Sequence, residues 1–171
     1  MGRFSRGRHL TMKRHLLFAL AGVLAACSPQ QQASAGSPAP AASRHPESGL
    51  QVIPLTVTGQ DGKVHKFKVE VAGTDEEQAK GLMFRRQMGA DEGMIFPRNP
   101  PDFASFWMHN TVIPLDIIFV GTDHRIINIS ANAEPYSENP RPSMGLAIGV
   151  LELNGGRAEQ LGIGPGAKVE W

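Results

Sequence analysis

Asp116 is the residue whose place in the sequence most demands a chemical explanation. It lies in the apolar run Leu115–Val120, where a carboxylate needs a charged or hydrogen-bonding partner or else takes up a proton. Two arginines follow the first helix expected below, and an amide and a hydroxyl precede the apolar run. The candidate partners are Arg85, Arg86, Asn110 and Thr111.

Two interpretations of this group are open. In the first, the carboxylate, an arginine and the amide form a structural network that fixes a corner of the domain to a helix, because buried ion pairs occur without catalysis. In the second, the same group lines a cleft, where an indole ring beside polar side chains suits a sugar or another small polar ligand. The predicted ligand-binding residues are Arg85, Trp107, Asn110 and Asp116.

Catalysis by this group would need a second poised acid or nucleophile, for which Glu152 and His109 are the candidates. The enzymatic alternative is a hydrolase acting on an envelope or extracellular glycan, with Asp116 and Glu152 as acid and base. No Gly-x-Ser-x-Gly, Walker loop or His-Glu-x-x-His motif occurs in the chain. A non-enzymatic binding or accessory role is therefore the leading hypothesis.

A metal site is not expected. Thioether and imidazole ligands suit copper, and several methionines accompany His109. Their spacing makes no compact ligand motif, however, and methionine commonly fills gaps in cores. The methionines considered are Met83, Met88, Met94, Met108 and Met144. We accordingly predict no metal and no cofactor.

The elements that must position these residues are mostly strands. Alternating or continuous apolar runs predict strands at 52–58, 64–71, 93–96, 103–109, 115–120, 125–130 and 146–153, with a last one over 168–171. Thr74 and Glu77 form a capping box that predicts a helix ending near Gly81, and a second short helix is expected over 157–161. The pattern predicts a mainly β fold, a small β-sandwich or partly closed, jelly-roll-like barrel with one or two short helices.

Three segments resemble a known family. They are Gly81-Leu82-Met83-Phe84-Arg85 with Gly93-Met94-Ile95-Phe96, the segment from Phe106 to Phe119 that contains Trp-Met-His-Asn-Thr-Val-Ile-Pro-Leu-Asp, and the tail Val150-Leu151-Glu152-Leu153-Asn154-Gly155-Gly156 with Leu161-Gly162-Ile163. Together they are similar to the domain-of-unknown-function 192 family, whose members are small bacterial and archaeal proteins, many of them exported. The resemblance implies a compact β-sandwich and no particular activity. At His109 the family often has Lys, so a role requiring a fixed cation there is not implied.

The N-terminal segment is typical of an export signal. Basic residues precede the apolar stretch Leu16–Ala26, which is about half the length needed to span a bilayer. Its end, Leu24-Ala25-Ala26-Cys27, resembles the lipobox of bacterial lipoproteins. We therefore predict a lipoprotein signal peptide over 1–26, lipidation at Cys27, and a disordered tether over 27–49 that joins a single domain at 50–171. In a host with two membranes, Ser28 favours the periplasmic face of the outer membrane.

The charge distribution excludes nucleic acid as an expected partner. After Cys27 the chain carries 12 Lys and Arg against 16 Asp and Glu, a net charge of −4. A domain of this sign lacks the basic surface that neutralises phosphates. The expected partners are the membrane, through Cys27, and a small polar molecule or glycan.

Overall fold

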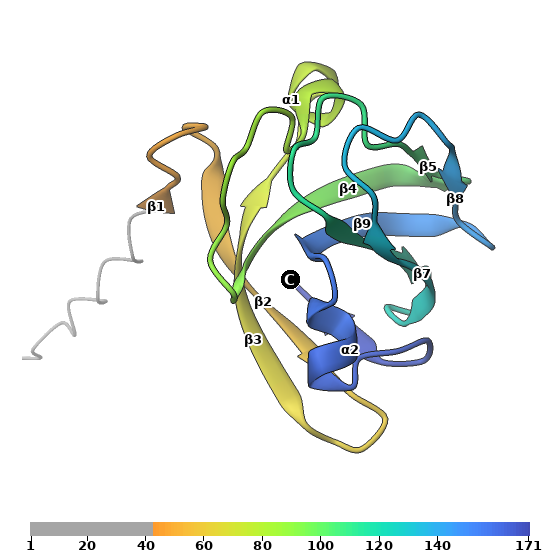
Figure 1. Ribbon diagram of the computed structural model, residues 1–171. Coiled ribbons are helices and arrows are strands. Elements are labelled where there is room, and N and C mark those ends of the chain that lie inside the picture. Colours follow the sequence, from red (N-terminus) through yellow and green to blue (C-terminus); the bar gives the residue numbers. More distant parts are fainter. Residues whose placement is uncertain (1–42) are drawn as a thin grey trace, which may run out of the picture. The chain divides into compact units, whose positions relative to one another are not determined.

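The computed structural model of the protein describes residues 43–171 (Figure 1). The predicted signal peptide, Cys27 and most of the predicted tether lie outside the described residues. The described residues form ten strands and two short helices: β1 (Ser43–Arg44), β2 (Gln51–Thr58), β3 (Val64–Val71), α1 (Asp75–Lys80), β4 (Glu92–Asp102), β5 (Ser105–Phe106), β6 (Leu115–Gly121), β7 (Ile126–Ala133), β8 (Arg141–Pro142), β9 (Ala147–Asn154), α2 (Arg157–Leu161) and β10 (Lys168–Glu170).

The large sheet has the strand order β1-β2-β3-β4-β9-β6-β7. Strand β10 lies off this path and pairs with β2 at Thr56, Val57 and Thr58. Neighbouring strands are antiparallel except β3 and β4, which are parallel. Figure 1 shows the sheet curling around the core, with α1 at one end and α2 at the other. A single bridge between Arg125 and Lys168 links the start of β7 to β10, so the described strands do not close into a barrel. The predicted mainly β, sandwich-like class is confirmed.

The middle strands are buried on both faces, which explains why β6 reads as a continuous apolar run. One core packs against one face of the sheet and includes Leu55, Val57, Phe67, Val69, Ile118, Leu151 and Leu153. A second core packs against the other face and includes Leu82, Met94, Phe96, Met108, Ile117, Phe119 and Val150. Polar side chains on β6 and β9 must therefore lie within one of these two cores.

Helix α1 begins with the predicted capping box. The Thr74 hydroxyl accepts from the backbone N–H of Glu77, whose carboxylate in turn accepts from the N–H of Thr74. The helix itself buries no residue. The apolar side chain that fixes this segment is Leu82, which lies beyond the helix end in the second core. Gly81 makes the turn possible with a φ of +47°, a value that side chains disfavour.

The strand predicted at 103–109 is mostly loop. Only Ser105–Phe106 is extended, and it pairs with β8 in a separate two-stranded sheet. After it the chain turns through His109 and Asn110, where Asn110 adopts a left-handed φ of 52° that asparagine tolerates. The Thr111 N–H closes this turn on the carbonyl of Met108. Phe106 and Met108 of this loop pack in the second core, whereas Phe103 and Trp107 are exposed. The apolar residues here therefore do not alternate across a sheet.

The domain also begins earlier than predicted, because the segment from Ser43 to Gly49 belongs to it. Strand β1 pairs with the edge of β2, and the turn that follows is held by its own backbone hydrogen bonds. The sequence of this segment has no apolar period, so only its contacts with the sheet reveal it. Neither helix that the structure describes is long and apolar enough to cross a membrane.

Candidate functional site

A cavity of about 240 Å³ opens between α1, strand β4 and the loop after β5. Its lining residues come from distant parts of the chain: Gln78, Ala79, Lys80, Gly81, Leu82, Met83, Phe96, Arg98, Ser105, Phe106, Trp107, His109, Thr111 and Glu152. This volume is below the usual range for drug-sized ligands, so it fits one small molecule or one end of a larger one. Three of the predicted residues, Trp107, His109 and Glu152, line this cavity.

Glu152 supplies the buried end of this cavity. It lies on β9 directly opposite Met94 of β4 and Ile117 of β6, so its side chain shares the face of the second core. Only 4% of the residue is exposed. Burial raises the pKa of the Glu152 carboxyl to about 8, and no hydrogen bond or charged neighbour offsets that shift. At neutral pH this side chain is therefore a neutral carboxylic acid that can both donate and accept a hydrogen bond.

Trp107 and His109 form the open side of the cavity. The Trp107 side chain is 54% exposed although it is large and apolar. Its ring stacks on that of His109 with centroids 5.1 Å apart, and the His109 Nδ1 lies 2.6 Å from the Glu138 carboxylate. The stacking and this polar contact fix the orientation of the indole. An exposed, oriented aromatic face beside a cavity is a common platform for a planar or cyclic ligand.

Two cations flank the same cavity. Lys80, in the last turn of α1, has no ion-pair partner among residues 43–171. Arg98 on β4 is held in place by Gln78 Oε1 at 2.8 Å and Asp102 Oδ1 at 3.1 Å. The Arg98 guanidinium also lies over the Phe106 ring, 5.9 Å from its centroid. The cavity thus combines cationic side chains at its rim with a neutral acid at its buried end.

Asp116 lies outside this cavity, contrary to the predicted cleft. Its partner in the β6–β9 ladder is Leu153, so it faces the first core, on the other side of the sheet from Glu152. Its Oδ1 accepts from the N–H groups of Asn132 at 2.7 Å and Gly156 at 2.9 Å, and its Oδ2 accepts from Ala158 N at 2.7 Å. Three backbone donors therefore stabilise this wholly buried carboxylate. Asp116 acts as a structural staple between β6, β7 and the start of α2, and it does not form an acid–base pair with Glu152.

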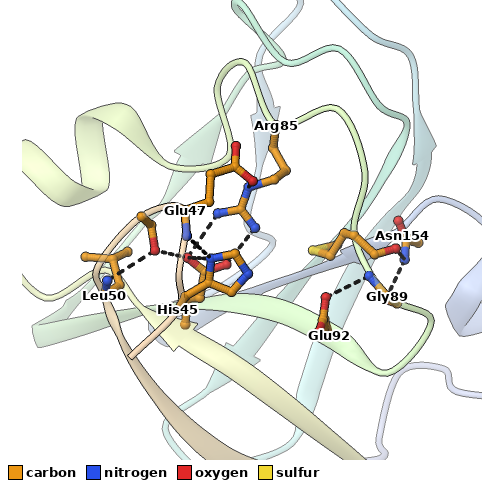
Figure 2. Close-up of polar contacts among 10 residues, drawn as sticks. His45, Glu47, Leu50, Arg85, Gly89, Glu92 and Asn154 are labelled. Atoms are coloured by element: carbon orange, nitrogen blue, oxygen red, sulfur yellow. Dashed lines mark hydrogen bonds and ion pairs between the residues drawn. The ribbon is translucent and has the colours of Figure 1, made fainter. Parts of the chain in front are cut away.

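Arg85 is also part of a structural network, with a partner that the sequence analysis did not name. Its guanidinium bonds both carboxylate oxygens of Glu70, at 2.8 and 3.1 Å. Burial by itself lowers the pKa of Arg85, but the hydrogen bonds and charge of Glu70 outweigh it and raise that pKa above its ordinary value. Figure 2 shows His45 and Glu47, from the segment Ser43 to Gly49, beside Arg85. Glu47 Oε2 lies 3.3 Å from Arg85 Nε, and His45 Nδ1 lies 3.7 Å from the Glu70 carboxylate.

Glu70 carries no signal of burial in the sequence, because in an alternating strand it shares one face with Lys66 and Lys68. The segment from Ser43 to Gly49 covers it, and the Ser48 hydroxyl donates to its carboxylate. Nothing in the sequence of β3 itself indicates that Glu70 is buried. The predicted network of Asp116, Arg85 and Asn110 therefore does not form. Backbone N–H groups hold Asp116, and Arg85 pairs separately with Glu70.

Asn110 contributes through its backbone and not as a ligand-binding side chain. Its carbonyl accepts from the N–H of Phe84 at 2.9 Å, which ties the loop to the end of the first helix segment. It does not line the cavity. Of the four residues predicted for the cleft, only Trp107 lies there, and the two candidates named for catalysis, Glu152 and His109, join it. Lys80 and Arg98 were not singled out, because solvated cations of this kind carry no motif.

Among residues 43–171 there is no group of three or more His, Cys, Asp or Glu side chains that could hold a metal ion. Met94 and Met108 are fully buried in the second core, whereas Met144 lies 81% exposed in a loop. The methionines therefore do not converge on His109.

Comparison with known proteins places this architecture in a family. The family model DUF192, described as "Uncharacterized ACR", matches residues 56–171. No curated protein matches the chain. A crystal structure of a protein of unknown function from Novosphingobium aromaticivorans DSM 12444 is 63% identical, with a TM-score of 0.74, over 77% of this chain and 93% of that one.

A second crystal structure, of a Sinorhizobium meliloti 1021 protein described as a candidate transcription regulator, is 36% identical, with a TM-score of 0.69, over 71% of this chain and 94% of that one. Neither description assigns a ligand or a reaction. Because the family model covers most of the chain and agrees with the fold, the chain belongs to the DUF192 family.

Proposed function

We propose that this domain is a non-enzymatic binding module for a small polar ligand, taken up in the cavity between Trp107 and Glu152. The observation that carries the proposal is the Glu152 carboxyl, which is 4% exposed, lines an open cavity and has no compensating partner. Leaving a polar group in that state costs free energy, and a ligand that supplies hydrogen bonds recovers it. An oriented indole at the opening completes a site for a ring with hydroxyl groups, such as a sugar.

The three segments that carry the family resemblance supply the walls of this cavity. Gly81 to Met83 comes from the first, Trp107 and His109 from the second, and Glu152 from the third. They are separated in sequence by up to seventy residues or so, and strand pairing brings them together. A feature built from all three segments is a better candidate for a shared binding role than the Asp116 and Arg85 networks, whose polar groups are saturated.

Ligand binding can be read from Trp107 itself. The chain has two tryptophans, so a Trp171→Phe background leaves Trp107 as the only indole. Titration with neutral and acidic monosaccharides is expected to change its fluorescence saturably, and Glu152→Leu is expected to weaken binding about tenfold or more through the lost hydrogen bonds.

Thermal shift provides the matched test. A ligand that binds the native state raises Tm, and this rise should persist in Met144→Ala and disappear in Trp107→Ala. Met144 serves as the control because it is exposed, apolar and outside the cavity. Saturable binding that is equal in the wild type and Glu152→Leu would reject the cavity as the site.

Hydrolysis of a glycan is the second candidate function. His109, oriented by Glu138 at 2.6 Å, and Glu152 line the same cavity, which places two titratable groups beside one ligand. This pair replaces the Asp116–Glu152 pair of the sequence analysis. Release of product from purified cell-wall polymer by the wild type, and its loss in Glu152→Gln, would favour hydrolysis over simple binding.

We further propose that the protein is a lipoprotein of the bacterial envelope, anchored through Cys27. The support is the lipobox-like segment Leu24–Cys27 behind a basic and apolar leader, in a chain that has no other Cys. Cys27→Ser removes the thiol that would carry the lipid. It is therefore expected to release the protein into the soluble fraction on cell fractionation. Membrane attachment that survives this substitution would contradict lipidation at Cys27.

A further inference from the structure

We infer that the ligand of the Trp107–Glu152 cavity is an anion, and specifically that it places a carboxylate against Glu152. This inference rests on the proposed binding function and adds to it the charge of the ligand. It stands on the geometry of the cavity, which has one deeply buried acid, two cations at the rim and apolar walls between them.

The groups facing Glu152 set the charge that the cavity accepts. Its neighbours across the sheet, Met94 on β4 and Ile117 on β6, are apolar and offer it no counter-charge. The charged or titratable side chains that share the cavity are Lys80 of α1, Arg98 of β4 and His109 of the loop. Asp116 of β6 faces the opposite core. Apart from Glu152, no carboxylate among the described residues lines the cavity. Asp102 pairs with Arg98 and Glu138 contacts His109 from outside the lining, so Lys80 is the lining cation that has no ion-pair partner among residues 43–171.

A neutral carboxylic acid in such surroundings is a hydrogen-bond donor to an anionic oxygen. Its O–H can donate to a ligand carboxylate, and hydrogen bonds of this charge-assisted kind are shorter and stronger than neutral ones. A carboxyl kept neutral by an apolar site so that it can donate to an oxyanion is known from other proteins. A cationic ligand would instead need Glu152 ionised in its apolar surroundings, and it would share the cavity with Lys80 and Arg98.

Aromatic and apolar walls indicate the rest of the ligand. Phe96 and Phe106 meet edge to face with centroids 5.0 Å apart, and the Trp107 ring lies at the opening. These surfaces favour a flat or ring-shaped body attached to the carboxylate. A sugar acid or a small aromatic acid satisfies both requirements.

The test uses three planar molecules of nearly equal shape that differ in charge: benzoate, benzamide and benzamidine. A second pair, glucuronate and glucuronamide, tests the same contrast on a sugar ring. Affinities are measured on the full chain in the Trp171→Phe background by Trp107 fluorescence and by calorimetry. We expect benzoate and glucuronate to bind about tenfold or more tightly than their amides at neutral pH.

The pH profile identifies the group responsible. Because the bound state requires the acid form of Glu152 and the ionised form of benzoate, the affinity should be highest between the pKa of benzoic acid and about pH 7, and about tenfold weaker at pH 9. Glu152→Gln retains a donor N–H and should bind benzoate without this alkaline loss. His109→Asn should keep the loss, since the titrating group is elsewhere. Lys80→Met should weaken benzoate binding several-fold, whereas Lys66→Met on the exposed face of β3 should not.

Two outcomes overturn the inference. Preferential binding of benzamidine, with affinity that increases with pH, would show that Glu152 acts as a carboxylate for cations. Tighter binding of the neutral amides would show that charge does not select the ligand. If none of the five probes binds, the proposed binding function fails as well, so this result is distinguishable from a wrong charge preference.

Discussion

Replacing Asp116 with Asn is expected to lower the free energy of unfolding by about 3 kcal/mol or more, a larger loss than we expect from any other polar substitution in the described domain. The carboxylate accepts three backbone N–H groups, from β7, from the residue before α2 and from α2 itself, with no exposure to solvent. Asn can accept at one oxygen only. Its amide N–H would face the N–H of Ala158, and a buried donor would lose its partner.

Urea unfolding followed by circular dichroism measures this change. The matched control is Asp123→Asn, because Asp123 also accepts from a backbone N–H, that of Arg125 at 3.1 Å, but in an exposed turn. The control should cost about 1 kcal/mol or less. Equal losses in the two variants would contradict the role of Asp116 as a buried staple, and an intact fold with lost ligand binding in Asp116→Asn would return it to the binding site.

Replacing Glu152 with Gln is expected to do the opposite, stabilising the domain at neutral and alkaline pH. The folded-state pKa of Glu152 is about 8, well above the value of 4.5 for an unperturbed glutamate. Between these values the unfolded chain is ionised at this position while the native state holds the proton. The native state therefore binds more protons, and its stability falls as pH rises through this window.

The size of the effect follows from the same shift. The advantage of Glu152→Gln over the wild type should increase by about 1.4 kcal/mol per pH unit above pH 4.5 and level off above pH 8. It should be on the order of 3 kcal/mol at pH 7 and vanish near pH 4. Urea titrations at several pH values measure it, with the exposed Glu159→Gln as control. A difference between the two variants that does not depend on pH would contradict a buried, neutral Glu152.

These two carboxyl groups differ for a reason that local sequence does not contain. Asp116 and Glu152 both interrupt apolar strands. From the sequence, Asp116 fits either a structural network or a cleft, and both residues are candidates for acid and base. The register of the strands decides which face of the sheet each carboxyl lies on. Pairing of Asp116 with Leu153 and of Ile117 with Glu152 puts the two carboxyls on opposite faces of the sheet. One face meets the N-terminus of α2, which offers backbone donors, and the other opens on the cavity.

Most of the elements could be predicted because their signals are local. The apolar run of β6, the alternation in β3, the capping box of α1 and the short helix α2 all depend on neighbouring residues, and the structure contains each of them. The prediction of a strand over 103–109 was wrong because some of its apolar residues pack on a core from a loop. Periodicity cannot distinguish such a loop from a strand.

By itself, the sequence determined the β-rich class, the family and the residue types available for chemistry, because composition, short-range pattern and motif spacing carry that information. The tertiary structure decided which of those residues meet. In the fold, Arg85 pairs with Glu70, backbone N–H groups satisfy Asp116, and Glu152 lines a cavity together with Trp107, Lys80 and Arg98. The physical reason is that burial and hydrogen-bond partners arise from contacts between segments distant in the chain, and these contacts alone separate a stabilised carboxylate from a neutral acid facing a cavity.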